Sequence, residues 1–396
     1  MTGRATGTLG APAVDQAELA AQRLRRLRSA LAGAPFEAVV LTTPESVFYA
    51  TGYRAVAAPL FRAHAMAAVV TADDLWLVCP AADTAPAADL GLPEDRLVPF
   101  GRFYFETATG SPLAEMADRH PDLASALATV VKAVVEAVGG GLRFGVESLA
   151  TVELPGAADA AGWVAAVRGV KLPGEVELLR YAARLALAGV QAAIDAAAPG
   201  ITERELAGIV AQVMVAGGAE PRFLVATTGP RSALADAHAG ERAWRPGELA
   251  RFDVGCVYAG YWSDIGRTAV LGEPDATQAS RYAAILDGLD QQIALAKPGV
   301  TAEELFDVAM DSVRRGGIGH YRRQHCGHGI GTSVYEPPIV APGAGTPVEP
   351  GMTFCFETPY YEIGWGGMMV EDTLVVTEDG VERFIESPRE LLVVDA

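Results

Sequence analysis

An internal repeat constrains the fold of this chain more than any other feature. The segments 199–218 (PGITERELAGIVAQVMVAGG) and 298–317 (PGVTAEELFDVAMDSVRRGG) share one pattern and begin 99 residues apart. Each opens with Pro-Gly, continues with a T-x-x-E capping box at Thr202 or Thr301, and ends in two glycines. The capping box predicts the start of a helix, and the glycines suit a left-handed cap at its end. We therefore expect two equivalent helices, one in each half of a duplicated domain.

Each half of the repeat also carries acidic residues at matching places. In PGELARFD and PGMTFCFE an acid lies seven residues after the proline, and a second acid follows eleven or fourteen residues later. These acids are Asp253 and Asp264 in the first half and Glu357 and Glu371 in the second. Duplication places them at the seam of a pseudo-twofold domain, where four carboxylates would repel one another unless cations held them. The sequence thus predicts a metal site. The alternative, ordinary surface carboxylates with turns and caps that recur by chance, does not explain the shared spacing.

The acid-bearing segments after the Pro-Gly turns are predicted to be strands. They are short, aromatic and β-branched, and they cover residues 249–258 and 352–361. The residues before about position 170 have a mixed α/β pattern of their own. Helices are expected at 17–32 and 122–138, and strands at 36–44, 65–73, 74–80 and 143–147. A long helix is expected to begin after Pro173-Gly174, at the start of the duplicated region.

Composition narrows the class of protein. The 396-residue chain is 50% hydrophobic and 20% charged, which supplies enough apolar material for two domains. Its net charge of −18 argues against nucleic acid as a partner. The cysteines show no CxxC spacing or disulfide framework, so reduced thiols are expected at Cys79, Cys256, Cys326 and Cys355. The N-terminal sequence MTGRATGTLGAPAVDQ lacks the apolar core of a signal peptide, and no apolar run reaches membrane-spanning length. We expect a cytoplasmic protein that contacts no membrane.

Histidines are few, and one of them stands out. His328 lies in the glycine-rich stretch HCGHGIG, where glycines let the backbone approach a ligand closely. One imidazole among four acids is a reasonable shell for Mn²⁺, Fe²⁺, Co²⁺ or Zn²⁺. His238 lies on a predicted loop ahead of Asp253, and a loop histidine taken alone is more often solvated than functional. His325, three residues before His328, stays open between a functional and a structural role.

Taken together, the acids and His328 resemble the five ligands of the dinuclear site in the "pita-bread" M24 metallopeptidase superfamily, in the same order. The matching motifs are FDVGCVYAGYWSDIGRT, HCGHGIG, PGMTFCFETP and VEDTLVVTEDG. The segment ESVFYATGYR and an R-x-x-K-x-x-x-E element at Arg168, Lys171 and Glu175 are similar to the aminopeptidase P, prolidase and creatinase branch. The resemblance implies an α/β (α+β) protein of two domains. These are a small N-terminal creatinase/prolidase-like domain at 1–168 and a C-terminal pita-bread domain at 169–396.

The resemblance also implies roles for the site residues. Two divalent metal ions would be bound, with Mn²⁺ as the first expectation and Co²⁺, Zn²⁺ or Fe²⁺ as alternatives. One metal would be held by Asp253 and the other by His328 and Glu357, with Asp264 and Glu371 bridging them. A shared water held as hydroxide would attack an amide carbonyl. Glu357 would also accept the proton of this nucleophile, and His238 would contact the substrate. The branch is commonly dimeric, so a homodimer is expected.

Two positions depart from the family pattern. Relatives commonly carry a second histidine seven residues after the metal-binding one, and here that position is Tyr335, in SVYEPP. A phenol can donate a hydrogen bond to a developing oxyanion, so Tyr335 is a candidate catalytic residue, although it could also merely fill space beside Pro337 and Pro338. Many relatives have arginine two residues before the last ligand, where this chain has Met369. Both departures affect substrate recognition and leave the metal ligands intact.

Three functional hypotheses follow. The first is a dinuclear metallohydrolase that resembles Xaa-Pro aminopeptidases and dipeptidases and cleaves an amide bond of a small peptide. The second keeps the metals but acts on a small non-peptide metabolite, by creatinase-like C–N hydrolysis or by lyase chemistry. The third is a non-catalytic binding module, and the complete set of five ligands argues against it.

Overall fold

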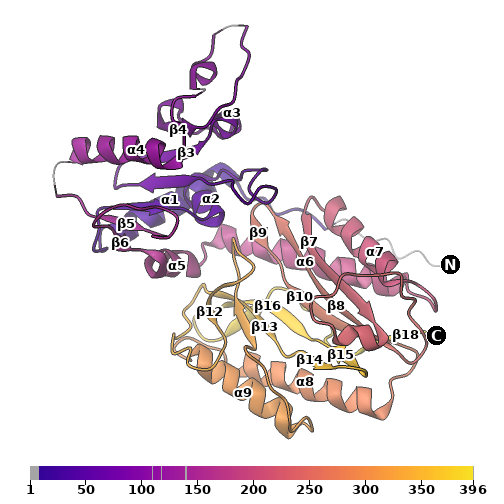
Figure 1. The fold of residues 1–396 in the computed structure, drawn as a ribbon. Helices are drawn as coiled ribbons and strands as arrows, with labels where there is room; N and C mark the ends of the chain where they lie inside the picture. The colour runs from indigo at the N-terminus through magenta and orange to yellow at the C-terminus, as the bar shows by residue number, and fades with distance from the viewer. Residues whose placement is uncertain (1–8, 109, 117, 139–140, 396) are drawn as a thin grey trace. The chain divides into compact units, whose positions relative to one another are not determined.

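The computed structural model describes residues 9–108, 110–116, 118–138 and 141–395 (Figure 1). The expectation that no signal peptide is present rests partly on residues 1–8, which lie outside the described residues. The chain forms two compact units. One contains residues 15–168, and the other contains the described residues up to 14 together with those from 169 onward.

The unit of residues 15–168 is built on one mixed sheet. Its strands lie in the order β4 (Leu97–Phe100), β3 (Leu75–Pro80), β2 (Ala67–Val70), β1 (Ala38–Leu41), β5 (Phe144–Val146) and β6 (Ala158–Asp159). Its helices are α1 (Gln16–Leu31), α2 (Pro44–Thr51), α3 (Thr84–Asp89), α4 (Leu123–Val138) and α5 (Ala161–Gly169). The strand prediction for 36–44 is too long, because Thr43 caps α2 by accepting a hydrogen bond from Ser46 N. The two helices and the other strands expected here are confirmed within a few residues.

The second unit contains two larger sheets and four long helices. The helices are α6 (Pro173–Asp195), α7 (Glu203–Ala216), α8 (Ala276–Leu295) and α9 (Ala302–Arg315). The first sheet has β18 (Leu392–Val394), β10 (Ile265–Leu271), β8 (Leu249–Tyr258) and β7 (Glu220–Thr228) in that order, with β9 (Tyr261–Trp262) paired to β8. The second has β12 (Glu336–Ile339), β11 (Gly327–Gly329), β13 (Thr353–Glu357), β16 (Glu371–Val376) and β17 (Val381–Arg383). A separate hairpin pairs β14 (Tyr360–Glu362) with β15 (Gly366–Met368).

The two halves of this unit repeat the same local chemistry. Both expected capping boxes form, with the Thr202 and Thr301 hydroxyls each accepting a backbone hydrogen bond at 3.2 Å. Only the second glycine of each terminal pair is left-handed, with φ of 81° at Gly218 and 116° at Gly317. The first glycine serves packing instead. A Cβ on Gly217 would lie 2.2 Å from Leu185 Cδ2 in α6, and one on Gly316 would lie 2.8 Å from Ala284 Cβ in α8.

The strand expected at 352–361 is interrupted. β13 ends at Glu357, and β14 begins at Tyr360 in a different sheet. Pro359 lies between them, and proline has no N–H to donate to a strand ladder. The break leaves Glu357 as the last residue of its strand. The other expected strand, 249–258, is β8 without change.

Helices α8 and α9 cover one face of the second sheet. Their buried residues, including Leu289 and Leu305, share one apolar core with Phe354 and Leu374 from β13 and β16. Figure 1 shows both helices, in orange, running beside these strands. Among the helices that the structure describes, none has both the length and the apolar content needed to cross a membrane.

Candidate metal centre

Strand pairing groups the predicted acids in two pairs, one in each of the two larger sheets. Glu357, at the end of β13, is the direct antiparallel partner of Glu371, at the start of β16. Side chains of directly paired residues lie on the same face of a sheet. Asp253 lies in β8 opposite Gly266, and Asp264 immediately precedes β10, the strand that contains Gly266. Acids that are more than a hundred residues apart in sequence therefore come from different sheets, whose strands β10 and β16 contact each other.

His328 is oriented for metal binding by its own backbone. In β11 it is the direct partner of Cys355 in β13. Its Nδ1 lies 3.0 Å from Gly329 O, and a carbonyl can only accept, so Nδ1 carries the proton. The other nitrogen, Nε2, is then left to face Asp264 Oδ2 at 3.6 Å. A histidine held through one nitrogen and free at the other is the usual arrangement of a metal ligand.

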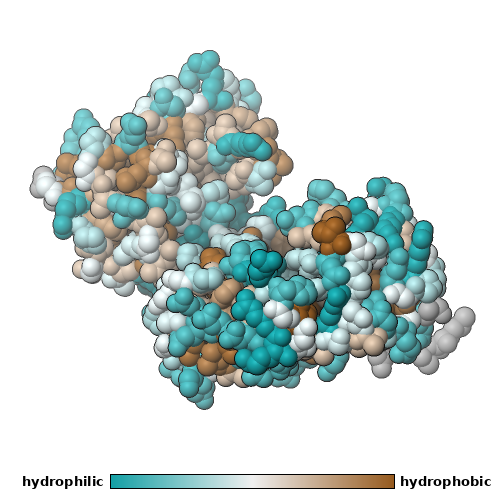
Figure 2. All heavy atoms as spheres, turned by 60° about the horizontal axis from the view of Figure 1, so that its bottom comes forward, coloured by the Kyte–Doolittle hydropathy of each residue, from teal (hydrophilic) through white to brown (hydrophobic). Residues whose placement is uncertain are grey.

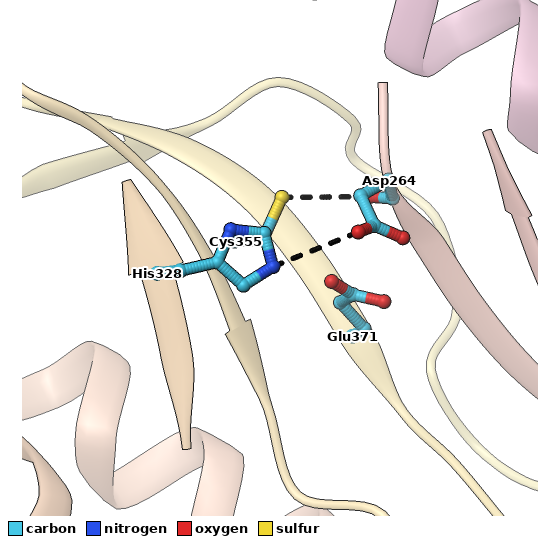
Figure 3. Close-up of side chains that lie close together, drawn as sticks. All are labelled: Asp264, His328, Cys355 and Glu371. Atoms are coloured by element: carbon cyan, nitrogen blue, oxygen red, sulfur yellow. Dashed lines mark hydrogen bonds and ion pairs between the residues drawn. The ribbon is translucent and has the colours of Figure 1, made fainter. Parts of the chain in front are cut away.

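Four donor atoms gather at this point (Figure 3). The side chains of Asp264, His328, Cys355 and Glu371 each offer one ligand atom, and these atoms all lie within 4.8 Å of one another. Asp264 Oδ1 and Glu371 Oε2 are buried and have no hydrogen-bond partner among the residues that the structure describes. Buried polar atoms are almost always paired, and two unpartnered carboxylate oxygens on residues of one donor group fit the place of a cation. The residues present therefore suit a divalent metal.

The electrostatics of the acids lead to the same conclusion. Burial, together with the charge of Asp264, raises the pKa of Asp253 to about 7 despite its ion pair with Arg251 at 3.0 Å. Burial also raises the pKa of Asp264, and burial with the Asp264 charge places that of Glu371 well above its usual range. Each shift means that the metal-free site disfavours ionised carboxylates. Bound cations would reverse this preference.

Glu357 behaves differently from the other acids. Its burial alone would raise its pKa, but hydrogen bonding to His325 and the charge of Arg323 outweigh burial and lower it. His325 Nδ1 lies 3.0 Å from one carboxylate oxygen, and Arg323 Nη2 lies 3.6 Å from the other. Glu357 is thus kept ionised within a buried acidic group. His325, whose role the sequence left open, contacts a candidate ligand directly.

Comparison with known proteins gives the family. The model of metallopeptidase family M24 matches residues 177–378, about half of the chain. The chain belongs to metallopeptidase family M24. The creatinase/prolidase N-terminal domain model matches residues 23–180. The mixed α/β fold, with this N-terminal domain and a C-terminal pita-bread domain, is therefore confirmed.

Individual relatives of this M24 protein are dipeptidases by name. It is 36% identical to the Xaa-Pro dipeptidase of Pyrococcus furiosus over 57% of this chain and 66% of the relative. It is 34% identical to the Xaa-Pro dipeptidase of Lactobacillus helveticus over 60% of this chain and 65% of the relative. The matched regions thus span less than two thirds of these relatives. The structure resembles dipeptidase PepE from Mycobacterium ulcerans with a TM-score of 0.74 and 26% identity, covering 98% of this chain and 100% of the other.

Tyr335, the first departure from the M24 pattern, lies against His328, the predicted metal ligand. Its ring stacks on His328 with centroids 3.8 Å apart, and it meets the His325 ring edge-on at 5.7 Å. The side chain is 51% exposed. Tyr335 is therefore not a core residue, and its catalytic role stays a prediction. Partial burial and the charges of Glu357 and Asp264 raise the pKa of Tyr335, so the hydroxyl stays protonated near neutral pH.

Met369, the second departure, packs beside the acids without contributing charge. It is buried, and a Cβ on Gly266 would lie 2.6 Å from Met369 Cγ. Two arginines that the sequence analysis did not single out supply guanidinium groups instead. Arg251 reaches Asp253 and Arg323 reaches Glu357, and both lie over the ring of Tyr361, at 5.1 Å and 5.5 Å from its centroid.

The R-x-x-K-x-x-x-E element supports the loops around the site. Lys171 Nζ lies 2.7 Å from Glu336 Oε2 in a buried ion pair. Glu336 also accepts backbone hydrogen bonds from Thr332 and Ser333, in the loop that leads to Tyr335. Glu175 accepts a hydrogen bond from the hydroxyl of Tyr261 at 2.9 Å. Tyr261 lies three residues before Asp264 in the chain. The conformation of both loops therefore depends on these two charged residues.

The structure brings some of the predicted site residues into one donor group and leaves others outside it. Asp264, His328 and Glu371 lie in the compact group, whereas Asp253 and Glu357 lie beside it and act on its charges. His238 is on an exposed loop, where its backbone carbonyl accepts from Arg231 Nη2 at 2.8 Å, and its contact with substrate stays a prediction. Cys355 was missed as a site residue. The sequence did contain a signal for it: Cys355 lies two residues before Glu357 on a predicted strand, and alternate residues of a strand share a face.

Proposed function

We propose that this protein is a metal-dependent peptidase that cleaves the amide bond of small Xaa-Pro peptides with two divalent ions. The observation that carries the proposal is the buried group around Asp264 and Glu371, whose unpartnered oxygens fit the place of cations. The names of the relatives support the substrate class. Their partial coverage is the reason that the activity is a proposal.

The roles of the residues follow from their surroundings. When bound, the two cations would activate a water molecule and polarise the scissile carbonyl. Glu357, kept ionised by His325 and Arg323, would accept the proton of that water at a carboxylate oxygen. The Tyr335 hydroxyl would donate a hydrogen bond to the oxygen on which negative charge develops. Asp253, Asp264, His328, Glu357 and Glu371 would hold the metals.

A second candidate is cleavage of a small non-peptide metabolite on the same metals. The half-exposed phenol of Tyr335 and the apolar side chain of Met369 favour it, because both differ from the family pattern beside the candidate metal centre. The two candidates are separated by assaying purified protein with added Mn²⁺, Co²⁺ or Zn²⁺ on Xaa-Pro dipeptides and on a panel of small amides. Activity confined to the non-peptide amides would exclude the peptidase.

The metal content tests the centre directly. Elemental analysis after reconstitution and gentle washing should find two divalent ions per chain, and fewer than one would exclude the site. Asp264→Ala should lose both metal and activity, since it removes a predicted bridge between the ions. Glu378→Ala is the matched control, because it removes an exposed acid between β16 and β17 and should leave both readouts unchanged.

We further propose that the protein forms a homodimer. The aromatic residues of the segments 59–70 and 101–107 suit either an interface or core packing, and four apolar side chains in these segments are exposed. They are Leu60, Phe61, Phe103 and Tyr104, with exposed fractions of 67%, 64%, 45% and 64%. Figure 2 shows one face of the molecule, on which hydrophobic residues in brown are scattered among hydrophilic residues in teal. A monomer in sedimentation at micromolar concentration would contradict the dimer.

A further inference from the structure

The Cys355 thiol belongs to the same donor group as the predicted ligands. Its Sγ is one of the four atoms that lie within 4.8 Å of one another, with donors from Asp264, His328 and Glu371. Figure 3 shows the Cys355 side chain overlapping the His328 ring in this view, with a dashed line from its sulfur to the Asp264 main chain. The register explains this position. Cys355 is the direct partner of His328 in β11 and of Thr373 in β16, and it shares its strand face with Glu357.

The protein contacts of this thiol are weak. Sγ lies 3.7 Å from the Asp264 backbone oxygen and 3.6 Å from Thr373 Oγ1. The side chain is fully buried, and the cysteine is free. Two other members of the donor group, Asp264 and Glu371, are 6% and 1% exposed, and Oδ1 of the first and Oε2 of the second have no hydrogen-bond partner among the described residues. These two unpartnered carboxylate oxygens are a second observation that points to a cation in the group that includes Sγ.

We infer that Cys355 is a ligand of the metal centre and gives it a preference for Zn²⁺ or Co²⁺ over Mn²⁺. The inference rests on the metal centre of the proposed function and deepens it. On binding, the thiol would release its proton to solvent and form a sulfur–metal bond, with no change of oxidation state. Thiolate is a soft ligand that suits zinc, whereas manganese favours oxygen donors.

The size of the donor group agrees with this assignment. Ligand distances to zinc are about 2.0–2.3 Å, so two donors of one tetrahedral ion lie roughly 3.3–3.8 Å apart. The four donor atoms, all within 4.8 Å of one another, would therefore have to move together by at most about 1.5 Å on binding. One sulfur, one imidazole nitrogen and two carboxylate oxygens also form a chemically reasonable set for zinc.

X-ray absorption of the zinc-loaded protein tests the inference without an activity assay. The spectrum should contain one sulfur per chain at about 2.3 Å from zinc. The cobalt-loaded protein should show a sulfur-to-cobalt charge-transfer band in the near ultraviolet. Both signals should be absent in Cys355→Ser and unchanged in Cys256→Ser. The control cysteine is also buried on a strand, in the first sheet, where its thiol lies 3.3 Å from Ser263 Oγ.

Metal competition provides a third measurement. In Cys355→Ser, the affinity for zinc relative to that for manganese should fall by at least roughly 10–100-fold. That is the loss usually seen when a residue that hydrogen-bonds a metal ligand is removed, and a ligand itself should matter at least as much. A zinc-loaded parent protein without a sulfur neighbour overturns the inference, and this result does not depend on whether the variant folds. Hydrolysis of Xaa-Pro dipeptides by that same sulfur-free centre would leave the proposed function standing. A sulfur signal without hydrolysis of Xaa-Pro dipeptides would support Cys355 as a ligand and contradict the proposed function.

Discussion

At the scale of single residues, Tyr335 lies between the candidate metal centre and solvent. Its ring lies flat on His328, while half of its surface remains accessible. The ring and the hydroxyl therefore have separable roles. The ring covers a predicted metal ligand, and the protonated hydroxyl is available to donate a hydrogen bond.

Tyr335→Phe should separate these two roles. The variant keeps the stacked ring, so its metal content should match that of the parent. Loss of the donor should lower kcat/KM on the true substrate by roughly ten- to a few hundred-fold, the usual effect of losing a hydrogen bond to the transition state. Steady-state kinetics with elemental analysis measures both quantities. Unchanged kcat/KM on the true substrate would show that the hydroxyl has no part in the reaction.

Tyr335→His tests which substrate class the pocket serves. If the chain is an ordinary Xaa-Pro peptidase, restoring the family imidazole should preserve or raise hydrolysis of Xaa-Pro dipeptides. If the pocket has been altered for another substrate, the same change should lower activity on that substrate. A histidine variant that loses all dipeptide activity while it retains its metals would argue against the peptidase.

At the scale of elements, the duplicated halves use glycine for two physical purposes. Gly218 and Gly317 reverse the chain with positive φ, which other residues rarely adopt. Gly217 and Gly316 instead allow close contact between helices. The sequence pattern of paired glycines predicts the helix end, but it does not separate these two functions. Only the packing of α7 on α6 and of α9 on α8 does so.

Gly316→Ala should destabilise the protein, because the new methyl would lie 2.8 Å from Ala284 Cβ and 3.0 Å from its Cα. We expect a loss of about 1–3 kcal/mol in the free energy of unfolding, as for other overpacked cores. Gly208→Ala is the control. Gly208 is an exposed helical glycine of α7 with no atom within 4 Å of its Cβ position, so alanine should stabilise by about 0.5–1 kcal/mol. Urea unfolding measures both, and equal effects of the two substitutions would contradict the packing role.

At the scale of the whole molecule, the acidic centre opposes folding when metal is absent. Asp253, Asp264 and Glu371 all have raised pKa values in the folded chain. Between the unfolded value near 3.8 and the folded value of about 7 for Asp253, the folded state binds more protons than the unfolded state. Its contribution to stability is therefore present at low pH and is lost as the pH rises through this window.

Chelator-treated protein should accordingly lose stability between about pH 4 and pH 7, the window set by the raised pKa of Asp253. Metal-loaded protein should be more stable at neutral pH and should not lose stability through the same window, because ions that bind only the folded state stabilise it and keep the acids ionised. Thermal unfolding at several pH values with chelator or with metal measures the difference. Chelated protein that gains stability toward pH 7 would contradict the proposed charge balance.

Several features of this protein were determined by the sequence alone. Local signals predicted the capping boxes at Thr202 and Thr301, the strand at 249–258 and most elements of the unit 15–168, because capping, turns and periodicity depend on neighbouring residues. The resemblance to a known family supplied the order of the candidate ligands. The cytoplasmic location, which rested on absent signals, stays a prediction.

Tertiary structure alone decided which side chains meet. The sequence placed Cys355 on the same strand as Glu357, but only the pairing of β13 with β11 and β16 brings its sulfur to His328 and Glu371. The contacts of Arg251 and Arg323 with the acids, and the stacking of Tyr335 on His328, likewise depend on how separate segments pack. Strand periodicity fixes the face on which a residue lies. The partner across that face is set by the register between strands, and for the site strands that register joins segments distant in the chain.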